Sequence, residues 1–193
     1  MSDLDTYHAT VEDLIAREAI KDCIYRFCHG VDRRDRETLR HCYWPEGTDD
    51  HISFSGNAYE FIDFILPFLQ GLKASTHSVS NILIRVDGDT ARAESYWHVF
   101  HREPGENGAD DYDYIAGGRY LDRFERRSGE WRILTRVLVR DWYEVIEGTG
   151  DWANYIRAAE GPHGSGKETD PVRALFGTLG GSPESPDQVS APA

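Results

Sequence analysis

The sequence has few basic residues and no long apolar run. Its 193 residues include 21 Lys and Arg against 34 Asp and Glu, which gives a formal net charge of -13. Such an excess of negative charge repels phosphate backbones, so we expect no nucleic-acid partner. No apolar stretch reaches the length of a membrane span, and residues 1–5 lack the basic and apolar regions of a signal peptide. We therefore expect a soluble, cytoplasmic protein without a membrane partner.

Only three cysteines are present, and none of them indicates a structural site. Cys23, Cys28 and Cys42 lie in stretches with helical patterns, and their spacing matches no zinc or disulfide framework. We interpret them as small core residues of a protein in a reducing compartment. The sequence also lacks a metal-binding or nucleotide-binding motif, so we expect neither a metal nor a cofactor.

The chain has the length of one ordinary domain with an appendage. We assign residues 1–148 to the domain and residues 149–193 to a C-terminal tail, because Gly, Pro and Ser become frequent after Gly148. Within the tail we expect a helix at 151–160 and disorder in roughly the last dozen residues. An apolar patch that suits a lid or a subunit contact consists of Val172, Leu175, Phe176 and Leu179.

Two hydrophobic periodicities divide the domain. Residues 10–30 repeat apolar side chains at helical intervals, which predicts a helix with one buried stripe that Gly30 interrupts. Further helices are predicted at 36–43 and at 58–71, the latter capped by Asn57, with turn signals at 45–47 and a short strand at 51–56. The period then becomes two, which predicts long strands at 76–86, 90–102, 112–127 and 131–145. The fold class is therefore α+β, a cone-shaped barrel in which helices wrap a curved antiparallel or mixed sheet around a pocket.

Asp32 directly continues the apolar stripe of the first helix. Burying a carboxylate without partners is costly, so Asp32 is either held by hydrogen bonds or placed in a cavity for chemistry. Taken alone, it is more typical of a helix cap or a surface acid. His77 lies at the start of the first long strand. Considered by itself, it is more typical of a core histidine that is hydrogen-bonded to a backbone carbonyl.

Strand alternation sorts the remaining candidate residues into faces. His98 and His101 point in opposite directions, so we expect no metal site built from this pair. Tyr96, His98 and Arg119 offer a hydroxyl, an imidazole and a cation on adjacent strands, which could bind an oxygenated substrate. Ordinary cross-strand pairing is the alternative for these three. Arg136 alternates with other arginines along its strand, and this spacing predicts exposure to solvent.

Several motifs resemble those of a known family, the SnoaL-like members of the nuclear transport factor 2-like superfamily. Within it, the group with scytalone dehydratase and lindane dehydrochlorinase is the most similar. The resemblance covers roughly residues 8 to 145. The motifs that carry it are Ile20 to Tyr25, Val31 to Arg33, Thr76 and His77 with Asn81, Gly118 to Tyr120, and Arg126 to Trp131 with Arg136 five residues later.

The resemblance implies a cofactor-independent active site. Asp32 would orient His77, His77 would act as general base, and Arg136 would stabilise negative charge on the substrate or leaving group. The implied protein is a homodimer or homotrimer and a lyase that eliminates water or another small group. Its implied substrate is small, hydrophobic and oxygenated, such as an aromatic, terpenoid or steroid alcohol.

Three alternatives share this fold and stay open. One is a carbon–carbon lyase that releases a small aldehyde such as formaldehyde from an aromatic diol. Another is an isomerase that moves a double bond by removing and returning a proton. The third is a non-catalytic ligand-binding or assembly subunit, which an exposed Asp32 far from His77 would favour.

Overall fold

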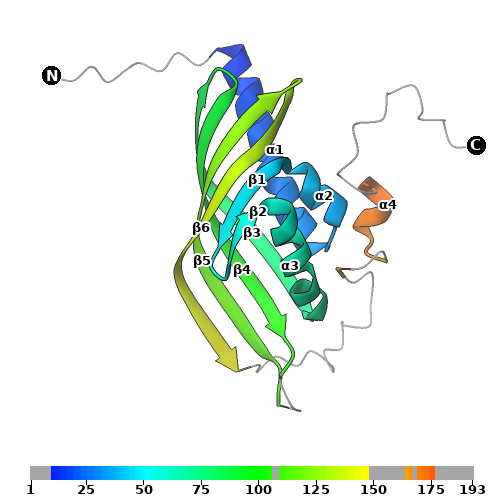
Figure 1. Ribbon diagram of the computed structural model, residues 1–193. Helices are drawn as coiled ribbons and strands as arrows, with labels where there is room; N and C mark the ends of the chain where they lie inside the picture. The colour runs from blue at the N-terminus through cyan, green and yellow to red at the C-terminus, as the bar shows by residue number, and fades with distance from the viewer. Residues whose placement is uncertain (1–9, 106–108, 148–163, 167–168, 177–193) are drawn as a thin grey trace, which may run out of the picture.

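The computed structural model describes residues 10–105, 109–147, 164–166 and 169–176, in which helices cover one side of a curved sheet (Figure 1). The predicted α+β class is therefore correct. The helices are α1 (Val11–Asp32), α2 (Arg36–His41), α3 (Ala58–Gly71) and α4 (Val172–Phe176). The strands are β1 (Tyr43–His51), β2 (Phe54–Asn57), β3 (Ala74–Asp87), β4 (Thr90–Glu103), β5 (Tyr112–Arg127) and β6 (Glu130–Glu147). None of the helices in these ranges is long and apolar enough to cross a membrane.

The sheet is mixed and open, with the strand order β2-β1-β6-β5-β4-β3. Strands β3 to β6 form the expected antiparallel meander, whereas β1 pairs with β6 in parallel. Helix α1 contacts β3 and β6, and α3 contacts β1 and β2. We call the sheet face that these helices cover the inner face, and the opposite one the outer face. The hydrophobic core lies between the inner face and the helices.

Helix α1 begins and ends where its sequence dictates. Thr10 and Asp13 form a capping box at its start, which satisfies backbone N–H groups that the helix leaves free. The helix continues through Gly30, so the predicted interruption is wrong. A Cβ atom at Gly30 would lie 2.9 Å from Leu39, so glycine is needed there to let α2 approach closely. Asp35 then caps α2 through Thr38, and the tight turn 33–35 joins the two helices.

The segment between α2 and α3 differs from the prediction. The sequence predicts a helix to residue 43, a turn at 45–47 and one strand at 51–56, but β1 already begins at Tyr43. The register of β1 on β6 shifts between Tyr43 and Thr48, so the strand contains Pro45 and Gly47 in an irregular stretch. Proline is tolerated at such irregularities because no ladder hydrogen bond is required of it. Strands β1 and β2 then pair as a hairpin.

The tail prediction can be compared with the structure only in part. The predicted helix at 151–160, the last residues and Leu179 lie outside the described residues. Val172, Leu175 and Phe176 form most of the short helix α4, in which Leu175 and Phe176 are 74% and 58% exposed. Figure 1 shows α4 beside α2 and the end of α1.

Candidate active site

Asp32 and His77 are brought together by the end of α1 and the start of β3. The Asp32 carboxylate accepts hydrogen bonds from Ser75 Oγ (2.8 Å), from the His77 backbone N–H (2.8 Å) and from His77 Nδ1 (2.7 Å). Each of the two side chains is 11% exposed. A carboxylate that continues the apolar face of α1 is thus stabilised by three donors from β3.

These contacts fix both the charge of Asp32 and the proton position on His77. Burial alone would raise the pKa of Asp32, but the hydrogen bonds from His77 and Ser75 outweigh it and lower the pKa below its ordinary value. An ionised carboxylate only accepts hydrogen bonds, so neutral His77 must carry its proton on Nδ1. Nε2 is then left with a free lone pair, and within the described part of the chain it makes no hydrogen bond. This is the arrangement of a general base.

A second histidine, His101, contacts this pair and is not among the predicted site residues. Ser75 and His101 are register partners, and the rings of His77 and His101 lie 5.5 Å apart. His101 is 8% exposed, and burial together with repulsion from His77 lowers its pKa to about 3. Strand alternation places His101 opposite His98, which by itself argues only against a metal site. The same alternation, combined with the face of His77, could have identified it.

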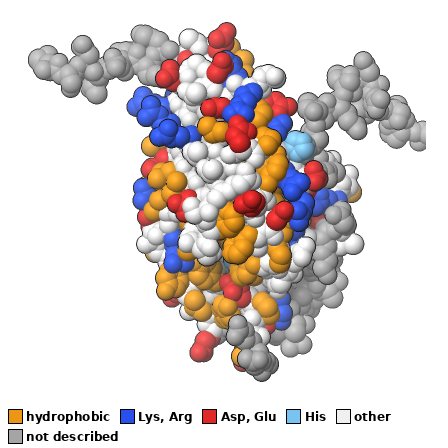
Figure 2. All heavy atoms as spheres, in the orientation of Figure 1, with side chains coloured by type: hydrophobic (Ala, Val, Ile, Leu, Met, Phe, Trp, Pro, Cys, Tyr) orange, Lys and Arg blue, Asp and Glu red, His pale blue; other side chains and the backbone are white. Residues whose placement is uncertain are grey.

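Aromatic rings continue from His101 along the inner face. Phe68 of α3 and Tyr114 of β5 lie 5.8 and 6.1 Å from the His101 ring, and Tyr143 stacks on Tyr114 at 6.0 Å. Tyr143 is 58% exposed and Phe68 45% exposed. Figure 2 shows hydrophobic side chains over the lower part of the molecule, where β6 ends. An aromatic wall therefore leads from the histidine pair toward the surface.

The low pKa of His101 predicts acid sensitivity. An unfolded histidine takes up a proton near pH 6.5, whereas folded His101 does so only near pH 3. The unfolded state therefore binds more protons between these values, and the free energy of unfolding falls as the pH falls. From about pH 6.5 to about pH 5 the loss is about 2 kcal/mol. Urea unfolding of wild type and His101→Gln at several pH values in this range measures the loss. If the free energy of unfolding fell equally steeply with pH in both proteins, the prediction would be contradicted.

Arg136 lies on the inner face and is 1% exposed. Its Nε and Nη2 each donate to Asp122 at 2.7 Å, and its guanidinium lies 4.2 and 4.1 Å from the rings of Phe27 and Tyr120. Burial opposes its charge, but attraction to Asp122 outweighs burial and raises the pKa of Arg136. Nη1 is buried and has no hydrogen-bond partner among the described residues. Arg136 is therefore a permanent buried cation.

The exposure that spacing predicts for Arg136 is wrong, and a β-bulge is the reason. Ile133 pairs with Phe124 and Thr135 with Arg123, which leaves Leu134 without a register partner. One extra residue in a strand reverses the alternation beyond it. Ile133 and Arg136 therefore share the inner face, although they are three residues apart.

Tyr96, His98 and Arg119 are not brought to the Asp32–His77 pair. Tyr96 pairs with Arg119 on the outer face, opposite to the face that carries His77, and is 38% exposed. Arg119 donates two hydrogen bonds of 3.1 Å to Asp141. The geometry here matches ordinary cross-strand pairing, the alternative to substrate binding.

Substitutions on the outer face test the two interpretations of these three residues. We expect Tyr96→Phe, His98→Gln and Arg119→Gln to leave kcat/KM within about twofold of wild type, because surface pairs of this kind contribute little. Steady-state kinetics on any substrate that the wild type converts provides the measurement. A tenfold or larger loss for one of them would return that residue to the site.

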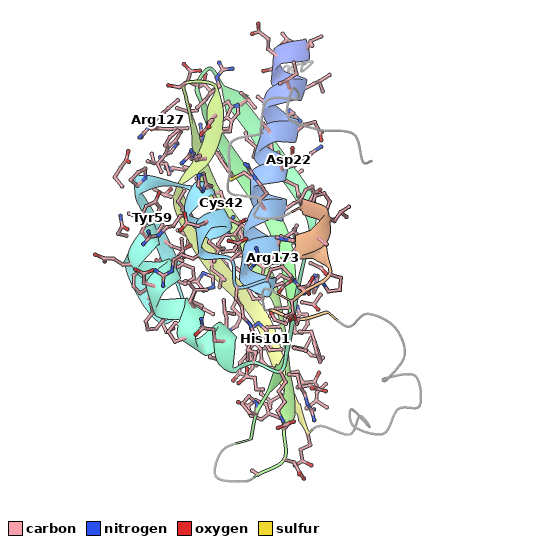
Figure 3. All side chains as sticks on the ribbon, turned by 90° about the vertical axis from the view of Figure 1, so that its right-hand side faces the viewer. Asp22, Cys42, Tyr59, His101, Arg127 and Arg173 are labelled. Carbon is pink, nitrogen blue, oxygen red and sulfur yellow. The ribbon has the colours of Figure 1, made fainter. Side chains whose placement is uncertain are left out.

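Within the described ranges, no group of three or more His, Cys, Asp or Glu side chains is placed to hold a metal ion. The inner face carries the oriented His77 imidazole, neutral His101 and cationic Arg136. In Figure 3, His101 lies on the sheet, close to the C-terminal end of α1. The tail segment with Arg173 lies nearby in the same view.

The structure is thus an α+β fold in which helices cover one face of a curved, open sheet, with the Asp32–His77 pair on that face. The chain belongs to the SnoaL-like domain family, whose model matches residues 12–137. It is 24% identical over 147 residues to protein Rv2910c of Mycobacterium tuberculosis, a match that covers 74% of this chain and 97% of that protein.

Solved structures with this fold include two named enzymes. A putative scytalone dehydratase from Novosphingobium aromaticivorans has a TM-score of 0.60 and 20% identity, over 72% of this chain and 95% of that one. A hexachlorocyclohexane dehydrochlorinase, LinA-type3 of Novosphingobium barchaimii, has a TM-score of 0.62 and 17% identity, over 72% and 96%. At these identities the likeness establishes the fold, which agrees with the predicted family.

Proposed function

We propose that the protein is a cofactor-independent lyase that eliminates water or another small group from a small, hydrophobic, oxygenated substrate. The observation that carries the proposal is the Asp32–His77 pair, in which three hydrogen bonds fix the carboxylate while His77 Nε2 bonds to none of the described residues. Two solved structures of similar fold are described as a dehydratase and a dehydrochlorinase, and both names denote eliminations. The proposal extends that reaction class to this chain.

The chemical step follows from the placement of the groups. His77 Nε2 removes a proton from the carbon next to the one that bears the leaving group, and the C–H electron pair forms the new double bond. The leaving group departs with the other bonding pair. When it is hydroxide, it takes up the proton that His77 Nε2 has gained and leaves as water, which returns His77 to its neutral form. Asp32 stabilises the positive charge that His77 gains. Arg136 is a permanent cation of the inner face whose Nη1 has no hydrogen-bond partner among the described residues, and it would stabilise developing negative charge.

The aromatic wall supports the choice of substrate class. Rings of Phe68, Tyr114 and Tyr143 offer stacking surfaces to a planar or alicyclic apolar molecule. His101 contacts His77 and is neutral at neutral pH. Its N–H group can therefore donate a hydrogen bond to a substrate oxygen without adding a charge to the site. We propose an aromatic, terpenoid or steroid-like alcohol as the substrate, and a homo-oligomer as the working form.

Mass spectrometry of reactions without added cofactor tests this proposal. Wild type is incubated with a panel of oxygenated aromatic and alicyclic alcohols beside Asp32→Asn and His77→Gln. A product lighter by one water, formed by wild type and lost in both variants, is the expected result. A product of unchanged mass would indicate an isomerase instead, and a released aldehyde would indicate carbon–carbon cleavage. Full turnover by His77→Gln would exclude His77 as the base.

A further inference from the structure

The described tail residues, 164–166 and 169–176, dock against the turn that follows Asp32. Arg33 Nη1 donates to Asp170 at 2.6 Å and to the Ser165 carbonyl at 2.8 Å. Arg173 Nη1 donates to Asp35 at 2.5 Å. Two ion pairs of opposite polarity thus join the tail to residues 33 and 35, on both sides of one tight turn.

This contact is buried and fully hydrogen-bonded on the carboxylate side. Asp170 is 5% exposed and Asp35 6% exposed. Asp170 also accepts from the backbone N–H groups of Ser165 (2.6 Å) and Val172 (2.9 Å), while Asp35 accepts from Thr38 as the cap of α2. Charge-assisted bonds of this length, shielded from water, are the stronger class of hydrogen bond. Because the polarity of the two pairs alternates, a shifted docking would place like charges together.

Charge, rather than apolar burial, holds the segment in place. Helix α4 has five residues, too few to be stable by itself, and its Leu175 and Phe176 are exposed. Figure 1 shows α4 on the side of α2 and α1 away from the sheet, and Figure 3 shows Arg173 there. The match to the family model spans residues 12–137, so this contact lies outside the matched part of the chain.

The docked segment also reaches the surroundings of Asp32 itself. A cavity of about 210 Å³ is lined on one side by Gly164, Ser165 and Gly166. The lining on its other side is formed by Asp32, Arg33, Arg34, Lys73, Ala74, Ser75 and Thr76. The backbone of the turn is held as well, since Arg173 Nη2 donates to the Arg33 carbonyl at 3.3 Å. The turn next to Asp32 is therefore held by the tail through the side chains of Arg33 and Asp35 and through the backbone carbonyl of Arg33.

We propose that Asp170 and Arg173 are positioning residues of the active site. By fixing the turn from Arg33 to Asp35, they hold the Asp32 carboxylate at the angle that selects the Nδ1–H tautomer of His77. The inference rests on the proposed function of the Asp32–His77 pair, but the geometry of that pair can be measured without turnover. Neither residue would touch the substrate.

The test uses the full chain with both charges of the tail neutralised, Asp170→Asn with Arg173→Gln. The matched control is Asp89→Asn with Arg126→Gln, which removes one exposed ion pair at the far end of the sheet. ¹⁵N NMR of the imidazoles, with the His77 signals assigned from His77→Gln, reports which nitrogen carries the proton. We expect one Nδ1–H form in wild type and control, and a tautomer mixture in the tail variant.

Kinetics separates positioning from a merely structural role. On a substrate that the wild type converts, the tail variant should lose kcat by about 10-fold or more while KM stays within about twofold. The single variant Arg173→Lys keeps the charge at this position and should therefore retain most of the wild-type kcat. A lower melting temperature with an unchanged His77 tautomer and unchanged kcat would overturn the inference, and so would full activity of the tail variant.

The two proposals fail in distinguishable ways. If the tail variant changes the His77 tautomer but Asp32→Asn keeps full activity, then the proposed function is wrong and the positioning contact stands. If Asp32→Asn is inactive and the tail variant leaves both the tautomer and kcat at wild-type values, the positioning role alone is wrong. Single variants Asp170→Asn and Arg173→Gln give the same readouts if the double variant does not fold.

Discussion

Asp32→Asn is expected to lower kcat/KM by about 10²- to 10⁴-fold, the range that a positioned general base contributes. The side-chain amide of the variant would present an N–H group where the carboxylate accepted from His77 Nδ1 at 2.7 Å. The imidazole would then carry its proton on Nε2, where it can no longer remove a substrate proton. Steady-state kinetics on a substrate found by mass spectrometry provides the measurement.

Two comparisons make this prediction specific. Asp32→Asn and His77→Gln act on one unit, so the double variant should be about as slow as each single variant. His98→Gln removes an exposed imidazole from the outer face and serves as the matched control. Independent, additive losses for Asp32 and His77 would contradict their function as a pair.

Asp122→Asn should destabilise the fold by about 3–5 kcal/mol, because it leaves Arg136 as an uncompensated buried charge. Both side chains are fully buried, and the variant loses the carboxylate that accepts the two bonds of 2.7 Å from Arg136. Equilibrium unfolding in urea, with the midpoint and slope compared with wild type, measures the loss.

The control for this second prediction removes both charges together. Arg136→Met combined with Asp122→Leu leaves neither charge of this pair, so its stability should lie much closer to wild type than that of Asp122→Asn. If Asp122→Asn unfolded at the wild-type urea concentration, the pair would not be holding a buried charge. If the apolar double variant were stable but inactive, this would support a role for Arg136 in the reaction.

Local patterns predicted those parts of the molecule that depend on local periodicity. The stripe of α1 and the alternation in β3 placed Asp32 and His77 correctly at two ends of elements, and the family motifs brought the two together. The strand faces of β4 also separated His98 from His101 correctly. Which face is the inner one depends on where α1 and α3 pack, and alternation alone carries no such information.

The errors arise where tertiary contacts override local rules. The bulge at Leu134 moves Arg136 to the opposite face of the strand, and no turn residue in the sequence indicates this bulge. The parallel pairing with β6 extends β1 through Pro45, which local turn signals had excluded. The docking of Asp170 and Arg173 joins residues more than 130 positions apart, a separation at which sequence spacing predicts nothing.

The most direct test of the central claim is the fate of the proton that His77 is proposed to remove. A converted substrate is prepared with deuterium on the carbon next to the leaving group, and both the rate and the isotopic content of the product are measured. For wild type we predict that the labelled substrate turns over more slowly than the unlabelled one and that its deuterium is lost to solvent. For His77→Gln we predict neither product formation nor loss of deuterium. Turnover at an unchanged rate with the deuterium retained at that carbon would contradict elimination by His77.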